Sequence, residues 1–234
     1  MKIVIPFDSA FYLSGRQALN CIKNVIRPQD SVLVVDLGLS QGKLKFLSKH
    51  HPDVEITTLD WSLLDEDWKK DKQSYYFKSI IWADLLNKKI KDVVLVIDSA
   101  CMIYRDLNDI ENLIKECQVY TPYSAEDIKT YCHPASIKKF GFTLPLDCNM
   151  RSGGCLGINL GTPIGQAFAG DFVKLCNDKD IIVPDGSDKS NHRQDQSVLT
   201  ILYWTYKMRC KLFDVKEWFG ISFHRNLWNN EVLL

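Results

Sequence analysis

The chain of 234 residues lacks several features that would assign it to a class at once. No apolar run approaches the roughly 20 residues that a membrane-spanning helix needs. The opening "MKIVIPFD" has a short apolar stretch that Pro6 and Asp8 interrupt too early for a signal peptide. The 29 basic and 29 acidic residues cancel, so no net charge attracts nucleic acid or an anionic membrane. We therefore expect a cytoplasmic protein with no membrane span and no nucleic-acid partner.

Cysteine motifs and glycine-rich loops are also missing. The eight cysteines form no CxxC pair, and neither they nor the histidines fall at zinc-ligand spacing. This pattern predicts reduced, mostly buried thiols. The segment "PFDSAFYLSG" has no phosphate-binding glycine loop, which argues against a nucleotidyltransferase. A methyltransferase is disfavoured because "VLVVDLGLSQGKL" has only Gly38 before its predicted helix.

What the sequence does have is an alternation of β-rich and helical stretches. This pattern is typical of parallel strands joined by right-handed helical crossovers. After residue 106 the alternation becomes irregular. We predict an α/β fold, a single domain over residues 1–234 with a nucleotide-binding half at 1–106 and a mixed acceptor-side half at 107–234. Strands are expected at 2–7, 31–37, 54–60, 92–98, 116–123 and 153–161, and helices at 13–27, 40–50, 74–89, 162–178 and 192–207.

Asp98 follows the apolar run "VVLVI", which reads as a strand buried on both faces. A carboxylate at the carboxyl end of such a strand lies where open α/β sheets bind ligands. Mg²⁺ and Mn²⁺ prefer carboxylate oxygens and often share them with substrate phosphates. Ser99 offers a hydroxyl, whereas Ala100 offers no ligand. The alternative is an aspartate that only caps a helix or turn.

A second polar group lies in "DGSDKSNHRQDQSVLTIL", where a turn-rich loop leads into an apolar helix. His192, Arg193, Asp195 and Gln196 stand at the start of that helix. A helix amino terminus offers free N–H groups and a positive dipole end, both of which favour anions. The alternative is a solvated first turn.

Smaller candidates stand beside these two groups. Gly153 and Gly154 permit close backbone approach or mark a β-bulge. Lys78 lies in an aromatic and apolar stretch, where an unpaired ammonium is costly to bury. It either neutralises phosphate or extends to solvent. His224 either completes a metal site or caps the sheet.

The end of the first strand is a candidate for the nucleotide base. Pro6 and Phe7 offer surfaces on which a base stacks, and Asp8 offers a carboxylate that reads an amide edge.

Taken in order, "IPFDSAFYL", "VVDLGLS", "YYFKSIIWADLL" and "VVLVIDSA" resemble the GT-A nucleotide-diphospho-sugar transferases, distantly similar to glycosyltransferase family 8. "YCHPASIKKFGF" and "NHRQDQSVL" also look like this group, and the resemblance covers about residues 2 to 224. It implies a GT-A fold with Asp98 at the first position of a DxD-type motif. The departure is Ala100, which replaces the second acid of that motif.

The resemblance implies a glycosyltransferase that uses a UDP-linked or similar donor, Mn²⁺ or Mg²⁺, and a hydroxyl acceptor on a glycan or other molecule. Asp195 is the expected general base, His192 is the alternative base, and Gln196 is the third expected catalytic residue. Asp98 and His224 are the expected metal ligands. Inversion and retention both stay open, as does a non-catalytic module that binds sugar nucleotides or glycans. The expected donor-site residues are Pro6, Phe7, Asp8, Lys78, Asp98, Ser99, Ala100, Gly153, Gly154 and Arg193.

Overall fold

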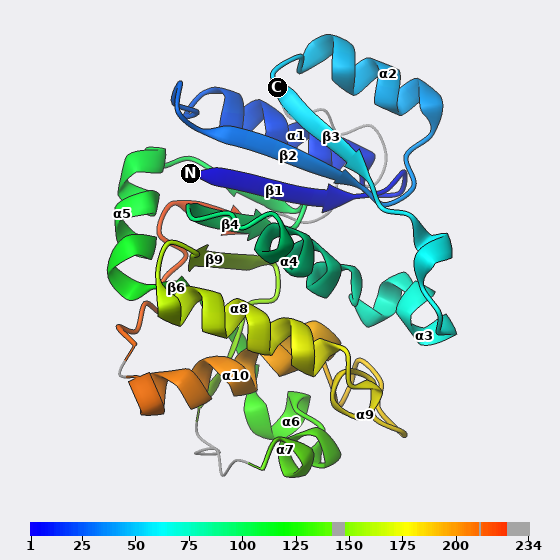
Figure 1. The fold of residues 1–234 in the computed structure, drawn as a ribbon, viewed down its shortest axis with the longest axis vertical. Coiled ribbons are helices and arrows are strands. Elements are labelled where there is room, and N and C mark those ends of the chain that lie inside the picture. The colour runs from blue at the N-terminus through cyan, green and yellow to red at the C-terminus, as the bar shows by residue number, and fades with distance from the viewer. Residues whose placement is uncertain (142–147, 211, 224–234) are drawn as a thin grey trace.

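A computed structural model describes residues 1–141, 148–210 and 212–223. Its centre is a six-stranded sheet of order β3-β2-β1-β4-β9-β6 (Figure 1). Strands β1 to β4 are parallel, and β9 runs antiparallel to both β4 and β6. This arrangement confirms the predicted α/β fold with a mostly parallel sheet. The strands are β1 (Lys2–Phe7), β2 (Ser31–Asp36), β3 (Val54–Thr58), β4 (Val93–Ile97), β6 (Val119–Tyr120) and β9 (Cys155–Asn159).

Helices cover both faces of the sheet because successive side chains of a strand point to opposite sides. Ile3 and Ile5 of β1 pack into a core with α1 (Tyr12–Lys23), α2 (Gln41–His50) and α5 (Leu107–Cys117). Val4, between them, belongs to the opposite core with α4 (Phe77–Asn87), α8 (Pro163–Cys176) and α10 (Gln194–Cys210).

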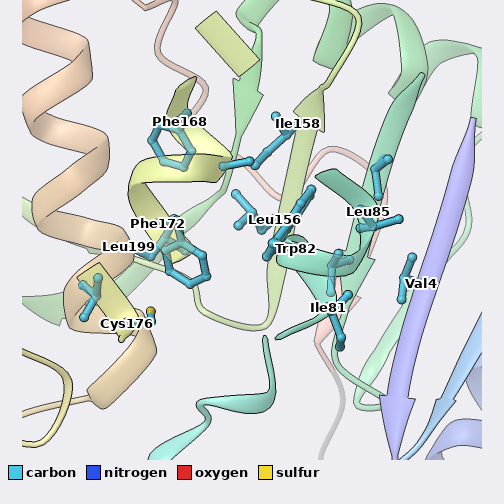
Figure 2. Close-up of a cluster of buried hydrophobic side chains, with 14 of the residues drawn as sticks. Val4, Ile81, Trp82, Leu85, Leu156, Ile158, Phe168, Phe172, Cys176 and Leu199 are labelled. Atoms are coloured by element: carbon cyan, nitrogen blue, oxygen red, sulfur yellow. The ribbon is translucent and has the colours of Figure 1, made fainter. Parts of the chain in front are cut away.

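The second core is shown in Figure 2. Trp82 of α4, the sheet residue Leu156 and the α8 side chains Phe168 and Phe172 belong to this core, and all four are almost fully buried. Truncating a buried ring of this kind to alanine costs about 3–5 kcal/mol. The packing therefore fixes α4 firmly against the sheet.

The order of the strands reverses between β1 and β4. The chain passes from β1 through β2 to β3 with helices on one face, and then returns through α4 on the other face to β4 beside β1. Ligands of open α/β sheets bind at such a switch point, outside the carboxyl ends of the strands. Asp8 and Asp98 follow those ends directly.

Two small antiparallel ribbons lie outside the central sheet. β5 (Cys101–Ile103) pairs with β10 (Ile221–Phe223), and β7 (Tyr123–Asp127) pairs with β8 (Asn149–Arg151). Short helices complete the chain: α3 (Asp67–Lys70), α6 (Ile128–Tyr131), α7 (Pro134–Phe140) and α9 (Lys179–Ile182), with 3-10 turns at Trp61–Leu63 and Lys72–Ser74.

The structure corrects one stretch of the predicted secondary structure. The expected strand at 116–123 is only β6, and it follows α5, which the sequence did not lead us to expect. Helical spacing is nevertheless present, because Ile110, Ile114 and Cys117 are all buried on one side, and Asp106 caps the helix.

Two further predictions concern membrane-spanning helices and the state of the cysteines. Among the described residues, no helix combines the length and apolarity that crossing a bilayer requires. The cysteines, all of which lie among the described residues, form no disulfide, and five of them are buried.

Candidate active site

A cavity of about 910 Å³ opens beyond the carboxyl end of β4. Its wall comes from the start of α4, the turn after β4, strand β7, the glycine segment before β9, the start of α10, and β10. Segments that lie far apart in the sequence therefore line one cavity. Seven of the predicted site residues line it: Lys78, Asp98, Gly153, Gly154, Arg193, Asp195 and Gln196.

Lys78, Asp98 and Asp195 form an ionic group at the bottom of this cavity. This group is here called the Lys78 triad. The Lys78 Nζ lies 3.0 Å from Asp98 Oδ1 and 3.1 Å from Asp195 Oδ2. Lys78 and Asp195 are 5% and 4% exposed, whereas the Asp98 side chain is 32% exposed and faces the cavity. The ammonium thus joins the carboxylate that follows β4 to the carboxylate at the start of α10.

Charge in the Lys78 triad follows from burial and proximity. Burial acts to lower the pKa of Lys78, but Asp195 and Asp98 outweigh it, so the pKa rises and the ammonium stays charged. Burial raises the pKa of Asp195 to about 6, with Lys78 acting against this rise and Asp98 adding to it. Asp195 is therefore a carboxylate that changes protonation close to neutral pH.

The two glycines allow the backbone to approach both acids. A Cβ on Gly153 would lie 3.1 Å from Asp195 Oδ2 and 3.0 Å from Gln196 Cβ. A Cβ on Gly154 would lie 3.2 Å from Asp98 Oδ2. The Gly153 carbonyl uses this closeness to accept a 2.7 Å hydrogen bond from Lys78 Nζ. The glycines therefore serve close backbone approach, one of the two predicted interpretations.

The start of α10 presents polar side chains to the cavity. Arg193 forms a 2.6 Å ion pair with Glu126 and lies over the Tyr131 ring, and Gln196 donates to the other oxygen of Glu126 at 3.0 Å. Gln194 has a φ of +41°, which is costly for a residue with a side chain. This local strain lies directly before Asp195.

His192 lies apart from this group. Its side chain is fully buried, and its two ring nitrogens interact with backbone atoms. Nδ1 accepts from the His133 N–H at 3.2 Å, and Nε2 is 3.1 Å from the Ile182 carbonyl. The structure gives His192 a structural role, so its geometry does not fit the predicted reserve base.

The residues at the end of β1 also differ from expectation. Phe7 is 1% exposed, and its ring packs so tightly beneath α1 that a Cβ on Gly15 would lie 2.8 Å away, so it offers no face to a base. Pro6 is buried within β1. Asp8 accepts from the backbone of the following turn and forms a 2.7 Å ion pair with Lys72.

The described residues provide a poor donor set for a divalent cation. Within residues 1–141, 148–210 and 212–223, no three His, Cys, Asp or Glu side chains gather as a metal site. Ser99 and Ala100 are buried in the turn after β4. Of the predicted ligands, Asp98 is already paired with Lys78, and His224 lies outside the described residues. The Mn²⁺ or Mg²⁺ site that the sequence predicted therefore stays a prediction, because the described residues hold only one of its two named ligands.

Several residues that line the cavity were not foreseen from the sequence. Tyr75, Tyr123, Trp218 and Phe223 add aromatic surface, and Glu126 and Lys189 add charge. The positive φ of Tyr75, +56°, directs the chain into α4 but has no marker in the sequence. Trp218 and Phe223 lie in the tail, whose aromatic character was visible but whose position was not.

Comparison with known proteins identifies the fold. The chain matches no family model and no curated protein. Among solved structures, an active-site mutant of LgtC superposes with a TM-score of 0.61 at 13% identity, covering 96% of this chain and 87% of that one. The chain has a GT-A fold.

Two other glycosyltransferases support the same GT-A assignment. The bifunctional glycosyltransferase WbbM gives a TM-score of 0.58 at 13% identity over 88% of this chain, which spans only 37% of WbbM. Mouse xyloside xylosyltransferase 1 gives 0.52 at 9% identity, covering 88% of this chain and 82% of that one. At these identities the likeness establishes the GT-A architecture.

Proposed function

We propose that this GT-A protein is a glycosyltransferase that moves a sugar, a hexose or a related one, from a nucleoside-diphosphate donor, UDP first among them, to a hydroxyl of a glycan or another acceptor. The observation that carries the proposal is the Lys78 triad, which places two carboxylates and an ammonium in a large cavity at the switch point of the sheet. Binding sites of open α/β sheets lie at this point.

The cavity has groups suited to both ends of a sugar nucleotide. Lys78, Lys189 and Arg193 line it and supply positive charge for a diphosphate. Such charges, fixed before the reaction, stabilise a departing anion more effectively than water does. The rings of Trp218 and Phe223, with centroids 6.2 Å apart, supply apolar faces on which a sugar or base packs.

Asp195 is the group best suited to activate the acceptor. In the transfer, the acceptor O–H proton passes to a base while its oxygen bonds to the anomeric carbon. The bond from that carbon to the diphosphate breaks, and the electron pair leaves with the phosphate. A carboxylate whose pKa is raised to about 6 by burial is mostly ionised at neutral pH yet more basic than ordinary aspartate.

The test is release of nucleoside diphosphate from a panel of nucleotide sugars, with and without glycan acceptors. Asp195→Asn is expected to lower the rate by about 10²–10⁴-fold while nucleotide binding persists. Asp185→Asn, the same substitution at a fully exposed carboxylate in the preceding loop, is the matched control and should leave the rate unchanged. Nucleotide binding without turnover by the wild type would instead indicate a binding module, and no binding would contradict the proposal.

A further inference from the structure

We infer that the Lys78 ammonium occupies the position that a divalent cation would take at this site, so that the donor diphosphate binds without metal. This inference rests on the proposed function and adds to it the charge on which the donor depends. It follows from where the ammonium lies, what it contacts, and which acid is missing nearby.

Oxygen atoms of the protein surround the Lys78 ammonium on three sides. A lysine Nζ carries three protons, and three acceptors surround it: Asp98 Oδ1 at 3.0 Å, Asp195 Oδ2 at 3.1 Å and the Gly153 carbonyl at 2.7 Å. A hard cation chooses ligands of the same kind, carboxylate and carbonyl oxygens. Lys78 thus interacts with the oxygen atoms that would otherwise serve as ligands for a metal ion.

A metal beside this ammonium would meet two obstacles. Ala100 stands two residues after Asp98, is 3% exposed and has no oxygen to offer. A divalent ion on the remaining oxygen of Asp98 would also lie within a few ångströms of a buried positive charge. At roughly 4 Å, such repulsion costs several kcal/mol even at an effective dielectric of about 20.

Among the described residues that line the cavity, positive and negative side chains are equal in number. Three cationic side chains line it, Lys78, Lys189 and Arg193, against three carboxylates, Asp98, Glu126 and Asp195. The Lys189 Nζ lies 6.0 Å from the centroid of the Tyr75 ring, and the Lys78 Nζ lies 5.2 Å from it. Protein side chains thus supply positive charge to the wall of the cavity.

The first experiment measures the effect of UDP on the thermal unfolding midpoint of the wild type, once in EDTA and once in Mn²⁺. A ligand that binds only the folded state raises the midpoint. We expect the same rise in both conditions. A rise that appears only with Mn²⁺ would overturn the inference, while leaving the proposed transferase function intact.

The second experiment removes the ammonium and uses Mn²⁺ alone as the probe. Lys78→Met leaves two facing carboxylates, so Mn²⁺ should bind and raise the midpoint by about 2–4 °C for each kcal/mol of binding, with loss of the free-Mn²⁺ electron paramagnetic resonance signal. The wild type and Lys78→Arg, which keeps the charge, should bind no Mn²⁺. Lys78→Met/Asp98→Asn should lose the gained binding.

The outcomes separate the two proposals. Failure of UDP to bind under any condition would contradict UDP as the donor nucleotide, whereas the Mn²⁺ titration still decides the role of Lys78. If Lys78→Met folds and gains no Mn²⁺ binding, or if the wild type binds Mn²⁺ in a way that Asp98→Asn abolishes, the inference is wrong. Should Lys78→Met not fold, the wild-type titration and its Asp98→Asn control give the decision.

Discussion

Two ionic clusters, each around a buried cation, are built in opposite ways. In the Lys78 triad one cation is shared by two carboxylates, and one of these faces the cavity. In the second, here called the Arg151 cluster, the cations Arg151 and Lys207 share the single carboxylate of Asp214. The triad carries a net negative charge and an open side, whereas the Arg151 cluster carries a net positive charge.

The Arg151 cluster is enclosed by protein. The Arg151 guanidinium lies 3.8 Å from the ring centroid of Tyr203 and 4.0 Å from that of Tyr123. It also donates to the carbonyls of Thr121 and Val215 at 2.9 and 3.0 Å. These contacts tie β8 to the segment 212–218, which leads to Trp218 at the cavity wall. The Arg151 cluster is thus positioned to hold the fold together, whereas the Lys78 triad keeps one carboxylate open to the cavity.

The largest expected effect tests the closed cluster. Arg151→Met removes a fully buried charge and leaves Asp214 with one partner fewer, and breaking such a pair costs about 3–5 kcal/mol. Urea denaturation measures this loss. Lys207→Met is the matched control, because its side chain is 27% exposed, and the expected loss is below about 1 kcal/mol. Equal losses in the two variants would contradict the enclosed structural role.

A smaller effect concerns the acid stability of the same cluster. Burial acts to raise the pKa of Asp214, but Lys207 and Arg151 outweigh it and lower the pKa to about 2. Because the folded pKa lies below the unfolded value, Asp214 stabilises the fold above about pH 4, and this contribution, about 2 kcal/mol, is lost as the pH falls toward 2. Unfolding free energies measured from pH 5 to pH 2 should therefore fall less steeply in Asp214→Asn. An unchanged slope would contradict the assignment.

The fold was predictable because its central strands have a characteristic run of apolar residues. Runs such as "VVLVI" are apolar at every position, since a strand with helices on both sides has no solvent face. The acids of the Lys78 triad were predictable for a related reason. Asp98 ends such a run, and Asp195 precedes another apolar stretch, so each marks an edge of the core.

The hydrogen-bond and ion-pair partners of Glu126 and His192 could not be predicted from the sequence. Nothing local in "SAEDIK" distinguishes Glu126 from any exposed acid, because its partners Arg193 and Gln196 are some 70 residues away. His192 looked like a base by composition, yet the backbone atoms that hold its ring come from α9 and from the segment before α7. Side-chain identity is local, whereas hydrogen-bond partners are set by tertiary packing.

The smallest expected effect tests the open cluster through the pH dependence of transfer. A general base works in its ionised form, so kcat/KM should fall about tenfold per pH unit below about 6, the value to which burial raises the pKa of Asp195. At pH 5 the expected loss relative to pH 7 is thus about tenfold. Asp98→Asn removes the neighbouring negative charge that adds to this rise, so the acid limb should move to lower pH even if the maximal rate drops. An acid limb that stays in place in Asp98→Asn would mean that a different group titrates, and the Lys78 triad would then lose its role as the base-bearing centre.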